Sequence, residues 1–165
     1  MEVEIGRWNA TNSQRITQLV GKTNQFNTTT RRLTEAELGS LDEKGLGVYW
    51  VRMADRYGDM GLIAVGILTR EGDNAVVHGL IMSCRVANRA MEQTMLAHMA
   101  NKARAAGCKT MIGEFIPTKK NTPVKELFPK LGFKQASVEG DTTRYTIDIT
   151  GTDLVIPDYV KVKEG

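Results

Sequence analysis

The stretch "IMSCRVANRAMEQTML", residues 81–96, joins an apolar strand to a helix through a cysteine and an arginine. Unpaired backbone N–H groups point outward at a helix N-terminus and attract anions. The same position lowers the pKa of a thiol. The junction can therefore hold a phosphate, a reactive thiolate at Cys84, both or neither, and the surrounding sequence has to distinguish these.

The bulk composition fits a single globular domain over residues 1–165. The chain is 41% hydrophobic and 25% charged, and its net charge of +3 comes without a basic stripe interleaved with aromatic residues, so nucleic acid is not expected as a partner. No apolar run is long enough to cross a bilayer. Cys84 and Cys108 make no disulfide framework, which favours a cytoplasmic location. The dispersed cysteines and histidines have no metal-ligand spacing, so no metal is expected.

Hydrophobic periodicity and turn residues predict the order β-α-α-β-β-β-α-β-α-β-β. Strands are expected at 1–9, 47–55, 61–70, 75–84 and 109–117, with two more within 133–150, and helices at 12–26, 33–41, 88–106 and 121–133. Thr34 and Glu37 form a capping box, and Pro129 should kink or end the last helix early. The lack of regular βα alternation predicts an α/β fold with one mixed sheet covered by helices.

This order resembles the GNAT acyltransferase fold, whose fourth strand leads into a phosphate loop of the form Arg/Gln-x-x-Gly-x-Gly/Ala. The matching residues are Arg85, Val86, Ala87, Asn88, Arg89 and Ala90. Asn88 replaces the middle glycine, and asparagine tolerates left-handed backbone angles better than most residues. The resemblance implies that this loop binds the phosphates of CoA or of pantetheine. It also implies that Asn121 bonds the pantetheine arm, although Asn121 can equally cap the following helix.

One position argues against ordinary acetyl transfer to an amine. In many GNAT enzymes a tyrosine near this place protonates the leaving thiolate, whereas the chain has Phe128. A phenyl ring has no hydroxyl and cannot act as an acid.

Four blocks, in order, resemble the C-terminal GNAT-like domain of FkbH-like proteins of the HAD-IIIC type. They are "KTNQFNTTTRRLTEAEL" (22–38), "DRYGDMGLIAV" (55–65), "LIMSCRV" (80–86) and "GEFIPTKKN" (113–121). The resemblance implies that a glyceryl unit from a phosphorylated three-carbon precursor is loaded on an acyl carrier protein in polyketide biosynthesis, for instance toward methoxymalonate. In that family an N-terminal haloacid-dehalogenase-type part removes the phosphate.

That phosphatase chemistry needs an Asp-x-Asp motif, which the chain lacks. The chain is therefore expected to be the C-terminal part of a larger protein or a stand-alone relative. The implied partners are the carrier protein and a phosphatase domain in the same or another chain.

Two further residues are candidates for catalysis. Cys84 is either a nucleophile favoured by Arg85 or a small core residue at a strand end. Glu114 shares a strand face with Ile112 and Ile116, so it is either a general base with a raised pKa or a partner in a salt bridge, for which Arg85 is a candidate. His78 is roughly 20 Å along the strand from Cys84, which predicts an edge histidine rather than a proton-transfer partner.

The polar run 22–32 is expected to form an acceptor or carrier-protein surface, or merely a capped loop. Three functions follow. The chain transfers an acyl group between thiols, with pantetheine in the gap between the fourth and fifth strands. Alternatively it is a non-catalytic module that docks the carrier protein, or a CoA-dependent N-acetyltransferase.

Overall fold

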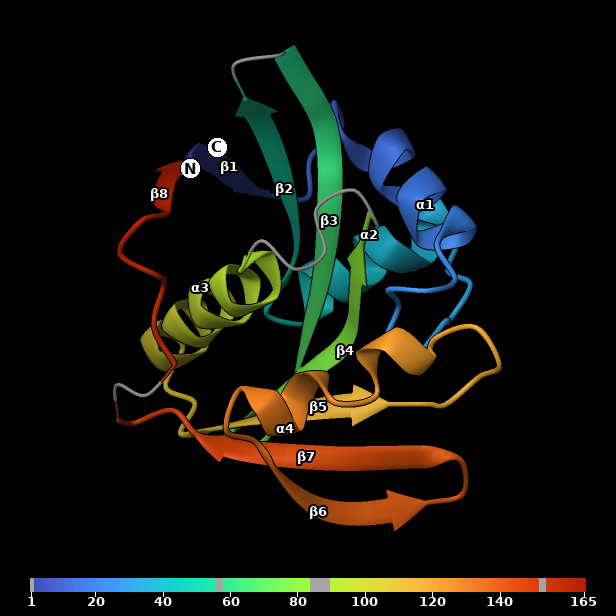
Figure 1. Cartoon of the computed structure of the whole chain (residues 1–165), viewed down its shortest axis with the longest axis vertical. Coiled ribbons are helices and arrows are strands. Elements are labelled where there is room, and N and C mark those ends of the chain that lie inside the picture. The colour runs from blue at the N-terminus through green and yellow to red at the C-terminus, as the bar shows by residue number, and fades with distance from the viewer. Residues whose placement is uncertain (1, 56–57, 84–89, 152–153) are drawn as a thin grey trace.

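The computed structural model describes residues 2–55, 58–83, 90–151 and 154–165, which form an eight-stranded mixed sheet with helices on both faces (Figure 1). The strands are β1 (Glu2–Arg7), β2 (Gly47–Asp55), β3 (Gly58–Glu71), β4 (Asn74–Met82), β5 (Thr110–Phe115), β6 (Lys134–Glu139), β7 (Thr142–Asp148) and β8 (Lys161–Glu164). Their order across the sheet is β6-β7-β5-β4-β3-β2-β1-β8. The pairs β4–β5 and β1–β8 are parallel and the others are antiparallel, so the predicted mixed sheet is confirmed.

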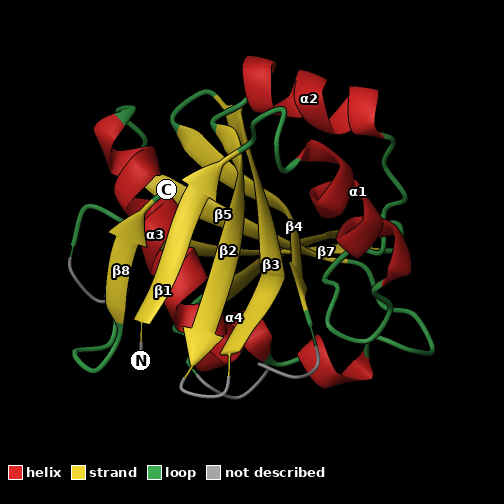
Figure 2. Cartoon of the chain, turned by 90° about the horizontal axis from the view of Figure 1, so that it is seen from above, coloured by secondary structure: helices red, strands yellow, loops and turns green. Residues whose placement is uncertain are grey.

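The helices lie on opposite faces of this sheet. They are α1 (Ser13–Lys22), α2 (Glu35–Lys44), α3 (Met91–Ala105), the 3₁₀ turn η1 (Thr122–Val124) and α4 (Leu127–Lys130). Figure 2 shows α1 and α2 on one face and α3 and α4 on the other. No helix in the described part of the chain combines the length and the apolar character needed to span a membrane.

Most predicted elements are present, but several of their boundaries differ and one strand was missed. The helix expected over 12–26 ends at Lys22. The helix expected over 121–133 is broken into η1 and α4, and the early end expected from Pro129 is confirmed. The strand β8 was not predicted, because its four residues, Lys-Val-Lys-Glu, include a single apolar side chain and carry little hydrophobic signal.

Local sequence signals account for several of the element ends. The Thr34 hydroxyl accepts from Glu37 N and the Glu37 carboxylate accepts from Thr34 N, which confirms the capping box. After α4, Gly132 adopts a φ of 93°, and Phe133 N donates to Phe128 O over 3.0 Å. The two phenyl rings then lie 5.0 Å apart between centroids, so Phe133 folds back on Phe128.

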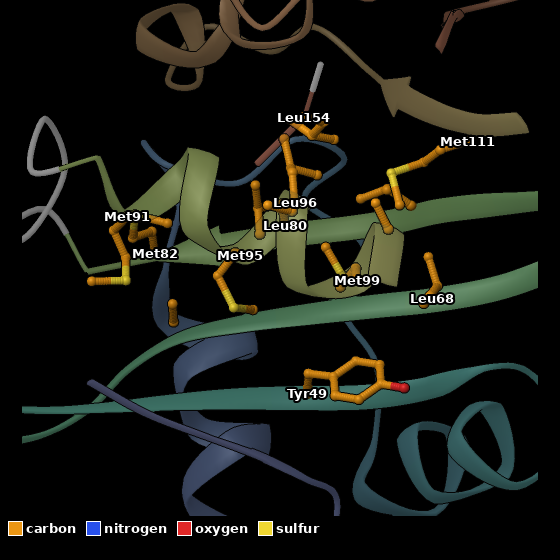
Figure 3. Packing of buried hydrophobic residues seen from close by; sticks show 14 of the residues in the cluster. Tyr49, Leu68, Leu80, Met82, Met91, Met95, Leu96, Met99, Met111 and Leu154 are labelled. Atoms are coloured by element: carbon orange, nitrogen blue, oxygen red, sulfur yellow. The ribbon is translucent and has the colours of Figure 1, made fainter. Parts of the chain in front are cut away.

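Methionines of α3 that face the sheet form part of the core. Met91, Met95 and Met99 are completely buried. Figure 3 shows them pointing toward the strands beside Leu80 and Met82. Flexible thioether side chains fill the irregular space over a strongly twisted sheet well.

The sheet changes direction between β4 and β5. The two strands pair in parallel only from Asn74–Thr110 to Val77–Gly113. In Figure 1, β5, β6 and β7 run across the direction of β2 and β3, so β4 and β5 separate beyond that point. The gap between the diverging strand ends is called the splay below.

Gly113, at the start of the splay, lies directly under the ring of Phe128. A Cβ at this position would come within 2.3 Å of the ring. We expect Gly113→Ala to lower the free energy of unfolding by about 1–3 kcal/mol, because a packed core has no room for the methyl group.

Urea denaturation followed by circular dichroism measures this loss. Gly21→Ala in α1 is the matched control, since nothing lies within 4 Å of its Cβ and alanine favours the helix. Equal stability of the two variants would contradict the close packing of Phe128 on β5.

Candidate functional site

The structure describes the residues on both sides of the junction between β4 and α3. Met82 ends β4, and Ser83 N donates to Ile63 O over 2.7 Å. Ala90, the last residue of the predicted phosphate loop, precedes α3 with a left-handed φ of 60°. Its carbonyl accepts from both Thr94 N and the Thr94 hydroxyl. The candidate nucleophile and the other five loop positions, Cys84, Arg85, Val86, Ala87, Asn88 and Arg89, lie outside the described residues, so their roles remain predictions.

A polar pocket opens where β4 ends. It has a volume of about 660 Å³ and brings together α1, the segment after α1, the end of β4 and the loop after β5. Its lining residues are Leu19, Lys22, Thr23, Asn24, Gln25, Phe26, Met82, Ser83, Lys119 and Lys120. Across the described ranges, none of the three lysines forms an ion pair with a carboxylate. The pocket is therefore bordered by solvated positive charge that is available to an anion.

The splay is filled by the chain itself. Residues 26–31, called the splay segment below, follow α1 and enter the gap between β4 and β5. Its bonds to β4 run from Thr28 N to Leu80 O (3.2 Å), from Leu80 N to Thr28 Oγ1 (3.0 Å) and from Met82 N to Phe26 O (2.9 Å). On the other side, Ile116 N donates to Thr28 O over 2.9 Å. Residues 22–32 were expected to form an acceptor or carrier-protein surface or a capped loop, and positions 26–29 within them are buried.

Two buried asparagines hold the splay segment in place. The Asn27 amide oxygen accepts from Thr30 N over 2.8 Å, and its nitrogen donates to Thr23 O over 3.1 Å. The Asn121 nitrogen donates to Asn27 O over 3.1 Å and to Ile116 O over 2.8 Å, and its oxygen accepts from Thr118 N. Asn121 therefore joins the loop after β5 to the splay segment. The alternative of a side-chain helix cap is wrong, because the Asn121 side chain makes no cap bond to η1.

Glu114 lies at the centre of a charged cluster next to the splay segment. Its carboxylate accepts from Arg31 Nη1 over 3.1 Å and from Arg144 Nη2 over 3.1 Å. His78 Nδ1 is 3.3 Å from Glu114 Oε1 and 3.0 Å from Arg31 Nη1, so its tautomer decides which of them it bonds. Arg144 also forms a bidentate pair with Glu71, with bonds of 3.0 Å and 2.7 Å.

The electrostatics of this cluster overturn one expectation. Burial of Glu114 opposes its ionisation, but the hydrogen bond from His78 and the charge of Arg31 outweigh burial and lower the pKa of Glu114 to about 2. The raised pKa expected of a general base is therefore wrong. Glu114 is a fixed anion that holds Arg31, and Arg31 in turn donates to His78 O over 2.6 Å.

Sequence reasoning missed the partners of Glu114 and the role of His78. The one sequence feature that pointed to such partners was Glu114 itself, because a carboxylate between apolar strand residues requires a cation nearby. His78 was expected at an exposed edge, yet it lies inside the cluster with Arg31 at its ring and at its carbonyl. The candidate pair Glu114–Arg85 stays a prediction, because Arg85 lies outside the described residues.

Phe128 is 1% exposed and is enclosed by aromatic rings. Its ring stacks on Tyr145 at 5.9 Å and contacts Phe133. The Phe128 side chain therefore packs against its neighbours and supplies no proton donor. Across the described ranges, no group of three His, Cys, Asp or Glu side chains is placed to hold a metal ion.

Structural comparison identifies the fold. The ribosomal-protein-S18-alanine N-acetyltransferase of Escherichia coli superposes with a TM-score of 0.65 at 14% identity, over 95% of this chain and 97% of that one. The GNAT domain of PAT from S. lividans gives 0.67 at 16% identity, over 87% and 89%. The chain has the GNAT fold. A putative acetyltransferase from Salmonella typhimurium, solved with its cofactor acetyl-CoA, gives 0.61 at 14% identity, over 89% and 94%. No protein-family model and no curated protein matches the sequence.

Within this GNAT fold, the splay between β4 and β5 is the place where pantetheine was expected. The described residues do not fit that expectation, because Leu80 and Met82 already bond the splay segment. The pocket beside Ser83 is therefore the described cavity that leads to the position of Cys84.

The low pKa of Glu114 makes stability depend on pH. A carboxylate whose pKa is depressed in the folded state stabilises above its unfolded value of 4.5, and this stabilisation is lost as the pH falls toward about 2. We expect the wild type to lose about 3 kcal/mol of unfolding free energy over that range, and Glu114→Gln to lack this loss and to be weaker by a similar amount at pH 7.

Urea denaturation at a series of pH values measures this dependence. Glu139→Gln, at an exposed position of β6, is the matched control and should follow the wild type. Parallel pH curves for the wild type and Glu114→Gln would show that the cluster does not hold Glu114 ionised.

Proposed function

We propose that the chain transfers an acyl group between thiols, with a carrier-protein-bound phosphopantetheine thioester as donor or acceptor. The observation that carries this proposal is the pocket at the end of β4, because Met82 and Ser83 line it and Cys84 is the next residue. Pantetheine carries amides along its length and a phosphate at its base. Gln25 offers an amide partner in the pocket, and the lysines around it offer cations for the phosphate.

In the proposed reaction the Cys84 thiolate attacks the carbonyl carbon of the thioester. A C–S bond to Cys84 forms, the C–S bond to pantetheine breaks, and the departing thiolate takes a proton from water. A second thiol repeats the exchange and removes the acyl group, so no oxidant or reductant is consumed. Because a thiolate leaves readily, this exchange needs no strong acid, in keeping with a phenylalanine at position 128.

The resemblance to FkbH-like proteins supports a glyceryl unit as the acyl group and polyketide biosynthesis as its destination. The proposed partners are an acyl carrier protein and a phosphatase of the haloacid-dehalogenase type, in the same or a separate chain. Arg85 and Arg89 are proposed to contact the phosphate from the junction side.

A second candidate function is a docking module that binds the carrier protein without catalysis. The filled splay favours it, because an enzyme that uses pantetheine in the splay would need that space open. CoA-dependent N-acetylation, the activity that the names of several structural neighbours give, is disfavoured here by the filled splay.

Intact-protein mass spectrometry after incubation with glyceryl-loaded carrier protein tests the proposal. We expect a hydroxylamine-labile glyceryl adduct on the wild type and none on Cys84→Ala, because only the thiol can form the thioester. Cys108→Ala, which removes a buried cysteine, should keep the adduct.

The two candidate functions give different results in the same experiment. Carrier-protein binding without an adduct on the wild type would reject covalent transfer and support the docking module. An adduct that survives in Cys84→Ala would reject Cys84 as the acceptor. Turnover of acetyl-CoA with an amine would support N-acetylation instead.

The lysines of the pocket provide a test of recognition. We expect the double variant Lys119→Glu, Lys120→Glu to bind the carrier protein with its phosphopantetheine arm about tenfold more weakly, or by about 1.4 kcal/mol. Each substitution removes a positively charged partner for the phosphate. The effect should shrink in about 1 M salt, where charges are screened within about 3 Å. Fluorescence anisotropy measures the affinity.

Lys130→Glu with Lys134→Glu is the matched control, since it changes the net charge equally on exposed positions of α4 and β6. Carrier protein without its arm should bind both double variants alike. Equal weakening by the two double variants would mean that the overall charge, and not the pocket, attracts the carrier.

A further inference from the structure

The splay segment occupies the backbone groups of β4 that an extended ligand would need. Between His78 and Met82, the carbonyl and amide groups with partners in this segment are His78 O, Leu80 N, Leu80 O and Met82 N. An extended molecule with regularly spaced amides, such as a peptide or a pantetheine arm, binds a sheet edge through such groups. In this protein, residues of the same chain already occupy the hydrogen-bonding groups at this edge of β4.

The segment bonds both walls of the splay. Thr28 accepts from Ile116 N on the β5 side, and Asn121 donates to the carbonyls of Asn27 and Ile116. Asn27, Thr28 and Asn121 are 0% exposed. A ligand entering the splay would have to displace the bonds that this segment makes, and any buried amide that the ligand did not pair would be left unsatisfied, which is unfavourable.

The charged cluster fixes the far end of the segment. Arg31 donates to His78 O and to Glu114 Oε1, so β4 and β5 are joined through one guanidinium. Glu114 is held as an anion by its surroundings, so this connection persists at neutral pH. The groups that face it are Arg144 from β7, His78 from β4 and, through Arg144, Glu71 from β3.

We infer that residues 26–31 act as an internal segment that closes the splay against a pantetheine arm, so that a thioester has to be presented at the lysine-bordered pocket instead. The closure stands on the described contacts alone. The presentation of a thioester at the pocket rests on the proposed function. The segment thus determines where on this fold a pantetheine arm can bind.

Amide hydrogen exchange with CoA titration, both followed by NMR, tests the closure. In the wild type we expect the Leu80 and Met82 amides to exchange as slowly as those in the middle of β3. Millimolar CoA should leave the Leu80 shift and the exchange of both amides unchanged; the Met82 shift is not used, because Met82 also lines the pocket. Asn121→Ala should speed exchange at both amides about tenfold, because the segment loses its link to the loop after β5. Asn101→Ala, on an exposed position of α3, is the matched control and should change neither.

Saturable CoA binding that shifts the Leu80 amide of the wild type would overturn the inference. So would unchanged exchange at the Leu80 and Met82 amides in a folded Asn121→Ala. If that variant does not fold, the wild-type titration alone still decides. Failure of the proposed function gives a different result. If the splay is closed but Cys84 forms no adduct, only covalent transfer is rejected. If CoA binds in the splay and the adduct forms, only the closure is rejected.

Discussion

Two parallel strands that diverge leave rows of backbone N–H and C=O groups without partners, and this constraint governs the centre of the molecule. Buried groups of this kind have to be paired by other atoms. Beyond Val77 and Gly113 the strands β4 and β5 no longer pair, and residues 26–31 satisfy both edges. The path of the chain between α1 and α2 follows from this requirement.

The segment that fills the splay is polar, and its polarity is what allows it to be buried there. Asn27 and Thr28 pair with backbone groups through side-chain atoms, and Thr28 also does so through its own N–H and C=O. An apolar segment would fill the space but would leave part of the strand edges unpaired. Arg31 then connects the segment to a carboxylate on β5, which extends the same network to β7.

The sequence predicted the elements that local rules control. Alternation and helical spacing located seven of the strands, the Thr34–Glu37 pair marked the start of α2, and Pro129 marked the early end of α4. It did not predict the burial of residues 26–29, because a run of asparagine and threonine has the composition of a solvated loop. Nor did it identify Arg31 and Arg144, which are 83 and 30 residues from Glu114 in the chain. Contacts over such separations come from topology and not from local pattern.

A shared fold does not carry a shared chemistry, because chemistry depends on which groups a fold leaves accessible. Here the GNAT fold is retained while two features of a CoA-dependent acetyltransferase are absent from the described residues. The splay is filled, and the ring at position 128 is packed between Tyr145 and Phe133. The accessible polar space has moved to the end of β4, where lysines from α1 and from the loop after β5 border it. The groups that this chain leaves accessible therefore differ from those that the fold alone would suggest.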